Sequence, residues 1–104
     1  MTFPRLLPVL ALAMASVTVP LPAAANPIER ACKASDRPAA TRALCACIGS
    51  VAERTLTRGQ MRDGARFFTD PQRAQDVRQS DRRGDEDLWR AWRNFGETAE
   101  AMCS

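Results

Sequence analysis

The sequence contains no histidine and no tyrosine among its 104 residues, and its aromatic side chains are two Trp and four Phe. Histidine is the most frequent general base in enzymes and a common zinc ligand, so its absence removes the usual catalytic pairs and the usual zinc sites. No nucleophile stands beside an evident base, and no pattern places two carboxylates in a cleft. We therefore expect a protein that is not an enzyme and that binds no cofactor.

The sequence also lacks an apolar run long enough to cross a membrane. Its main apolar stretch, Leu6 to Val19, is shorter than the roughly 18 residues that indicate a membrane span. The stretch follows a positive start at Arg5 and precedes the small residues Ala23 to Ala25, which together form the three-part pattern of a secretory signal peptide. We predict that residues 1–25 are a signal peptide cleaved before Asn26, and that the mature protein is periplasmic or secreted and has no transmembrane segment.

The mature chain, residues 26–104, is long enough for one small domain only, since a chain of this size buries about 60% of its unfolded surface. All four cysteines of the sequence lie in it: Cys32, Cys45, Cys47 and Cys103. An even number of cysteines in a short exported chain indicates disulfides, here two.

The spacing of the cysteines limits how they can pair. Cys45 and Cys47 are two residues apart on a predicted helix, where their side chains point about 200° apart and cannot easily be bridged. Cys32 therefore pairs with one of them and Cys103 with the other. A turn at residues 35–38 brings Cys32 nearer to Cys45, and Cys47 shares a face with apolar residues, so we prefer Cys32–Cys45 with Cys47–Cys103.

The same cysteines permit a different interpretation, in which Cys45 and Cys47 act as a thiolate site for a soft metal or as a redox pair. The missing histidine weakens the first alternative, and the absence of the usual Cys-x-x-Cys spacing weakens the second. We assign no metal ligand.

Charge is nearly balanced along the mature chain, which has 14 basic residues once Arg5 is taken from the 15 of the sequence, against 12 acidic ones. A nucleic-acid-binding protein would show a one-sided basic surface, so we expect no nucleic-acid partner. Four arginines do recur at four-residue spacing and could form an anion-binding ridge on helices: Arg54, Arg58, Arg62 and Arg66. Such rows are more often the solvated face of a helix.

The pattern along the mature chain predicts an all-α fold of four or five short helices, with no strand. Cap residues followed by proline at Asn26 and Asp70 each predict the start of a helix, and Thr57 to Gln60 has the form of a capping box. The predicted helices cover residues 27–34, 39–56, 57–69, a short segment from 71 through 77, and 85–103, the last after a polar loop at 80–84.

The large aromatic residues permit two interpretations. They recur at helical spacing with other apolar residues, which is typical of a core-facing stripe. They could instead line a pocket for an apolar ligand, which would make the protein a small carrier. The residues concerned are Phe67, Phe68, Trp89, Trp92 and Phe95, and we expect Trp89 to be the most exposed.

Three acidic residues near the start of the last helix, Asp81, Asp85 and Asp87, only superficially resemble a calcium loop. The ligand register of an EF-hand is absent, so a helix-capping role explains them better.

Several short stretches carry a family resemblance: Leu44-Cys45-Ala46-Cys47-Ile48, Phe67-Phe68-Thr69-Asp70-Pro71, Arg78-Gln79-Ser80-Asp81 and Phe95-Gly96. With them the mature chain resembles a group of small exported alphaproteobacterial proteins that are sometimes labelled arginine transporters. The resemblance implies an exported protein and no residue role. A mature chain without a membrane span cannot itself form a translocation path.

Together these features predict a small exported interaction protein whose arginine-rich outer face meets an acidic protein or an anionic envelope surface. The metal or thiol function and the apolar carrier are the alternatives.

Overall fold

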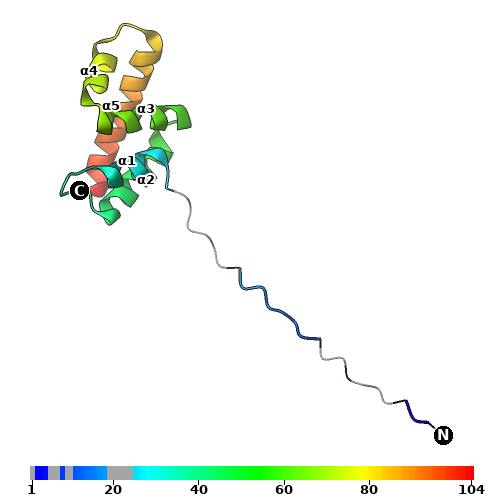
Figure 1. The fold of residues 1–104 in the computed structure, drawn as a ribbon. Helices are drawn as coiled ribbons and strands as arrows, with labels where there is room; N and C mark the ends of the chain where they lie inside the picture. The colour runs from blue at the N-terminus through cyan, green and yellow to red at the C-terminus, as the bar shows by residue number, and fades with distance from the viewer. Residues whose placement is uncertain (1, 5–7, 9–10, 19–24) are drawn as a thin grey trace.

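The protein is described by a computed structural model that covers residues 2–4, 8, 11–18 and 25–104. Within these residues the chain forms five α-helices and no β-strand (Figure 1). The helices are α1 (Pro27–Ala34), α2 (Arg42–Thr55), α3 (Arg58–Thr69), α4 (Pro71–Gln79) and α5 (Arg83–Cys103). The all-α class predicted from the sequence is confirmed. Of the predicted four or five helices, the described residues form five. The predicted signal peptide falls partly outside the described residues.

The amino-terminal ends of α1 and α3 follow the local chemistry of the sequence. The Asn26 side-chain oxygen accepts a hydrogen bond from the N–H of Glu29 at 2.9 Å, and Pro27 occupies the first turn. Thr57 and Gln60 form a complete capping box, in which each side chain accepts a hydrogen bond from the backbone N–H of the other. These contacts satisfy N–H groups that have no partner inside a helix.

The second helix begins later than the predicted residue 39. A turn closed by the Ala40 N–H on the Arg37 carbonyl at 3.0 Å occupies this segment. The Thr41 hydroxyl then accepts a hydrogen bond from the N–H of Leu44 at 3.1 Å and caps α2. Ala39 and Ala40 have no side-chain oxygen, so Thr41 is the first residue after Pro38 that can cap a helix.

The boundaries around α4 and α5 differ from expectation in two details. Asp70 precedes α4, but its side chain makes no capping hydrogen bond, and its N–H instead closes α3 on the Arg66 carbonyl at 2.9 Å. The predicted loop at 80–84 is two residues too long, because α5 begins at Arg83 after the cap residue Arg82. Asp85 lies in the first turn of α5, where a negative charge is favoured, without a side-chain cap.

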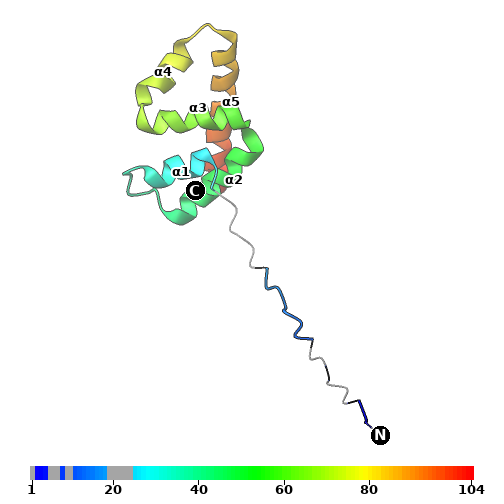
Figure 2. The same cartoon turned by 45° about the vertical axis from the view of Figure 1, so that its right-hand side comes forward.

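The core lies between α1, α2, α3 and α5. Its buried residues are Ile28, Val51, Ala52, Leu56, Met61 and Phe95. Partly buried apolar residues pack around them, among them Ile48, Ala65 and Trp92. No residue of α4 is buried, so this helix adds little to the core. In both ribbon views α4 lies at the end of the molecule remote from α1 and α2 (Figures 1 and 2).

Helix α2 is the central element, because it packs against both α1 and α5. Two disulfides join it to the same two helices: Cys32–Cys45 connects α1 to α2, and Cys47–Cys103 connects α2 to the end of α5. The preferred pairing is therefore confirmed. Cys45 is fully buried between α1 and α2, whereas Cys47 is half-buried and joins α2 to the end of α5.

Two glycines mark the places where helices approach closely. A β-carbon at Gly49 in α2 would lie 2.8 Å from the β-carbon of Glu29 in α1. A β-carbon at Gly64 in α3 would lie 2.8 Å from Cε3 of the Trp92 ring in α5. Real β-carbons do not approach other atoms so closely, so both contacts need glycine.

Candidate anion-binding groove

A groove with a volume of about 590 Å³ runs between the start of α1, the end of α2 and one face of α3. This volume lies within the roughly 300–1,000 Å³ typical of small-ligand sites. The lining residues are Ala25, Asn26, Pro27, Arg30, Glu53, Arg58, Met61, Arg62, Ala65 and Arg66.

Helix α3 supplies most of the positive charge of the groove. Arg58, Arg62 and Arg66 are four residues apart, so they lie on one face of the helix, one turn above another. The capping box fixes where α3 begins and therefore fixes this face relative to the core. Met61, which is buried, and Ala65, which is partly buried, lie beside the arginines and form an apolar floor.

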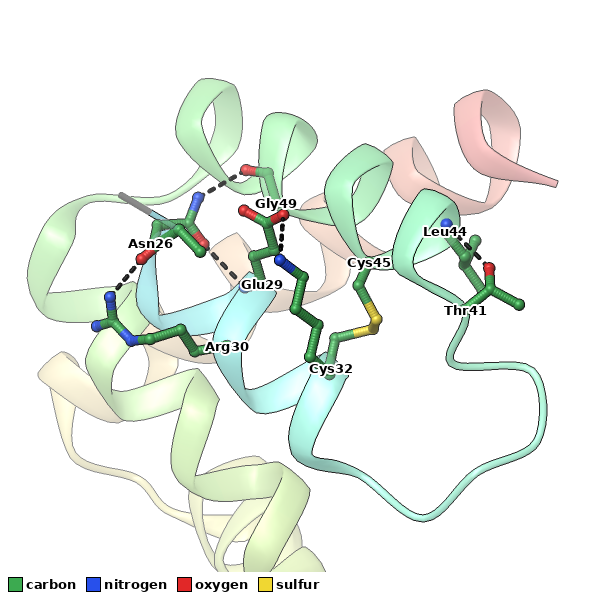
Figure 3. A network of polar contacts seen from close by, with 10 residues as sticks. Asn26, Glu29, Arg30, Cys32, Thr41, Leu44, Cys45 and Gly49 are labelled. Atoms are coloured by element: carbon green, nitrogen blue, oxygen red, sulfur yellow. Dashed lines mark hydrogen bonds and ion pairs between the residues drawn. A yellow bond between two sulfur atoms is a disulfide. The ribbon is translucent and has the colours of Figure 1, made fainter. Parts of the chain in front are cut away.

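Helix α1 adds a fourth arginine. Because α1 packs against α3, Arg30 lies across the groove from the α3 row. Its guanidinium donates a hydrogen bond to the carbonyl oxygen of Ala25, at the amino-terminal edge of the groove (Figure 3).

Asn26 holds the start of α1 against α2 (Figure 3). Its side-chain amide donates to the Gly49 carbonyl at 2.8 Å and to the Glu53 carboxylate at 3.0 Å. The wall of the groove beside α1 is therefore fixed by hydrogen bonds between two helices. Glu53 is also the one carboxylate in a lining that includes four arginines.

None of these four arginines forms an ion pair within the part of the chain that the structure describes. The ion pairs there join Lys33 to Glu29 at 3.2 Å, Arg90 to Asp87 at 4.0 Å and Arg93 to Glu97 at 4.0 Å. A guanidinium group presents five N–H donors in a planar fork that matches a carboxylate or phosphate. The groove therefore offers donors for an anion with few internal carboxylates to compete for them.

The predicted ridge and the observed groove overlap only in part. Three of its arginines, Arg58, Arg62 and Arg66, line the groove, whereas Arg54 lies on α2 outside it. Arg30 was not predicted, because no periodic pattern in the sequence links it to α3. The sequence predicted that the first helix folds back on the second, but not that it packs against α3, which is the contact that brings Arg30 to the groove.

A second groove lies between the end of α4 and the first half of α5 and is lined by Arg78, Trp89, Arg90 and Arg93, among others. Two of its arginines already have carboxylate partners, and Asp81 and Glu86 also belong to the lining. Its charge is therefore more nearly balanced than that of the first groove.

The remaining aromatic residues pack against one another. The Trp92 ring lies 5.1 Å from that of Phe67, 6.5 Å from that of Phe68 and 4.9 Å from that of Phe95, measured between ring centroids. The first two pairs are edge-to-face, a favourable geometry. Trp92 thus joins α3 to α5, and these four rings line neither of the two grooves described above. Trp89 is half-buried, as Trp92 and Phe68 are.

All four cysteine sulfurs are in disulfides, so none is a thiolate in this structure. Among the described residues no group of three or more His, Cys, Asp or Glu side chains is placed to hold a metal ion. Of the three acidic residues near α5, Asp87 pairs with Arg90, while Asp81 lies in the connection before the helix.

Comparison of the chain with protein-family models, with curated proteins and with solved structures finds no match. Among the helices of the described residues, none combines the length and the apolar character needed to cross a membrane. The resemblance to small exported alphaproteobacterial proteins stays a prediction.

Proposed function

We propose that the protein is an exported, non-enzymatic interaction protein that binds an acidic partner through the groove between α1 and α3. The observation that carries this proposal is the convergence of four arginines, none of them ion-paired, on one groove with an apolar floor. Exposed pairs of a guanidinium and a carboxylate contribute up to about 1 kcal/mol each. A measurable affinity therefore needs several such contacts along the groove, together with burial of apolar surface on its floor.

Export is part of the proposal. Disulfides form and persist in oxidising compartments such as the periplasm or the extracellular space, and both disulfides here join elements of the core. The signal-peptide pattern of residues 1–25 and the resemblance to small exported proteins support the same location.

The shape of the groove favours an acidic protein segment over a membrane surface. Lipid head groups form a flat array and are attracted by a basic face on one side of a protein. The four arginines here are exposed, but they stand on both sides of a groove, with Arg30 opposite the α3 row and the buried Met61 between them. A single extended chain that carries carboxylates and small apolar side chains fits such a space better.

The proposal is tested by measuring the affinity of the mature protein for a fluorescein-labelled hexaglutamate peptide by anisotropy. Binding should weaken as salt is raised, and Arg58→Glu with Arg62→Glu should weaken it by about tenfold or more, because two charged contacts become repulsive. The matched control, Arg37→Glu with Arg73→Glu, changes the net charge equally at exposed positions outside the groove.

The control should bind within about twofold of the unchanged protein. Equal weakening in both double variants would mean that net charge alone drives binding, and the groove would be rejected. Vesicles of anionic phospholipid provide a second arm of the experiment. Tighter capture by vesicles than by the peptide, with the same dependence on Arg58 and Arg62, would overturn the choice of an acidic protein as the partner.

A further inference from the structure

The groove begins at the peptide bond where the signal peptide is expected to be removed. Ala25 and Asn26, the two residues that this bond joins, both line the groove. The Ala25 carbonyl also accepts the hydrogen bond of Arg30, one of the four arginines of the site. The residue that should leave with the signal peptide therefore occupies both space in the groove and a donor that an anion could use.

We propose that proteolytic processing completes the anion site, so that the precursor binds acidic partners poorly and the mature protein binds them well. This inference rests on the function proposed above. A signal peptidase would hydrolyse the bond between Ala25 and Asn26 and consume one water molecule. Ala25 leaves with the signal peptide as a carboxylate, and Asn26 keeps the nitrogen as a new α-amino group, which is protonated at neutral pH because its ordinary pKa is about 7.7–8.0.

Two changes in the groove follow from this reaction. The Arg30 guanidinium loses its acceptor in Ala25, and its donors become available to a ligand. A new positive charge also appears on Asn26, which lines the groove together with four arginines and Glu53. Whether the new ammonium group meets the ligand or neutralises Glu53, the net positive charge of the groove rises by one.

The new ammonium group would be held in a fixed place. The Asn26 side chain bonds to the Glu29 N–H at 2.9 Å and to the Gly49 carbonyl at 2.8 Å (Figure 3). It also donates to the Glu53 carboxylate at 3.0 Å. None of these contacts uses the bond to Ala25, so they can persist after cleavage. A chain end that is held in place contributes to binding without the entropy cost of ordering it.

The core of the fold should not depend on the segment that is removed. All five helices, both disulfides and every residue of the core lie within residues 26–104. Exposed apolar side chains occur in the described part of the leader, such as Phe3 at 88% and Met14 at 91% of their full exposure. The mature and precursor forms can therefore be compared as the same folded domain.

The test compares three forms for affinity to the hexaglutamate peptide: residues 26–104 with a free α-amino group, the same residues with Asn26 acetylated at its α-nitrogen, and the full chain. The acetyl group restores a carbonyl at the position of Ala25 and removes the new charge. We expect the free form to bind about fivefold or more tightly than the other two. Far-UV circular dichroism should be the same for the free and acetylated forms.

A variant separates the two causes. In Arg30→Met no side-chain donor can bond to the acetyl carbonyl, so acetylation should reduce the affinity less than it does in the unchanged protein. Equal affinity in all three unchanged forms would overturn the inference and leave the proposed function standing. Absence of binding in every form would instead overturn the proposed function, and this inference with it.

Discussion

The contact between Gly64 and Trp92 gives the sharpest test of the packing between α3 and α5. Replacement of Gly64 by alanine puts a β-carbon 2.8 Å from Cε3 and 3.1 Å from Cη2 of the Trp92 ring. The ring cannot easily move away, because Phe67 and Phe95 pack on it at centroid distances of 5.1 and 4.9 Å.

Two opposing effects set the size of the change in stability. Alanine stabilises a helix interior by about 0.5–1 kcal/mol relative to glycine, because the unfolded chain has less freedom to lose. Overpacking of a close contact costs about 1–3 kcal/mol. We therefore expect Gly64→Ala to lower the free energy of unfolding by about 1–2 kcal/mol, which corresponds to roughly 4–16 °C in Tm for a domain of this size.

Gly96 in α5 supplies a matched control, since a β-carbon there meets no atom within 4 Å. Gly96→Ala should raise the free energy of unfolding by about 0.5–1 kcal/mol. Both variants are measured by urea unfolding followed by circular dichroism, with the fluorescence of Trp89 and Trp92 as a second probe. If both substitutions stabilise the protein by the same amount, α3 and α5 do not approach as described and the reasoning is refuted.

The remaining predictions concern the disulfides and the helix caps. Loss of Cys47–Cys103, which closes 56 residues, should cost about 4 kcal/mol of stability, and loss of Cys32–Cys45, which closes 13, about 3 kcal/mol; urea unfolding of paired Cys→Ala variants checks the order. The purified protein should weigh four hydrogen masses less than its reduced form; an unchanged mass on reduction would contradict both bonds. Thr57→Ala removes the capping box and should cost about 1 kcal/mol, whereas Asp70→Ala, which loses no side-chain cap, should change stability by less than about 0.5 kcal/mol. Equal losses at the two positions, seen as equal shifts of Tm, would contradict the capping geometry.

Features that depend on neighbouring residues were predictable from the sequence. The caps at Asn26 and Thr57 were predicted because a side-chain oxygen needs only the next turn of the chain to find its N–H partner. The same holds for the end of α3 at Thr69, before Pro71. The cysteine pairing was also predictable, since helix geometry excludes a bond between Cys45 and Cys47 and leaves only two alternatives.

Features that depend on how helices pack were not predictable in the same way. Arg30 reaches the groove because α1 lies against α2 at the close contact between Glu29 and Gly49, and no local pattern reports this contact. From the sequence alone, Gly49 is only a residue of low helix propensity inside a predicted helix. In the structure it permits the close approach of α1 and α2. Charge patterns therefore indicated a row of arginines, and tertiary packing decided which of them share a groove.

The two disulfides also shorten the covalent path between Asn26 and Ser104. Seven residues lead from Asn26 to Cys32, three from Cys45 to Cys47, and two remain from Cys103 to the carboxyl end. When the chain is pulled at both ends, this path can extend to only ~40 Å, against ~270 Å for the reduced chain. A single cut by a protease between residues 33 and 44, or between 48 and 102, likewise leaves the two pieces joined. In a compartment that contains proteases, the protein can be nicked in most of its length and still remain one molecule.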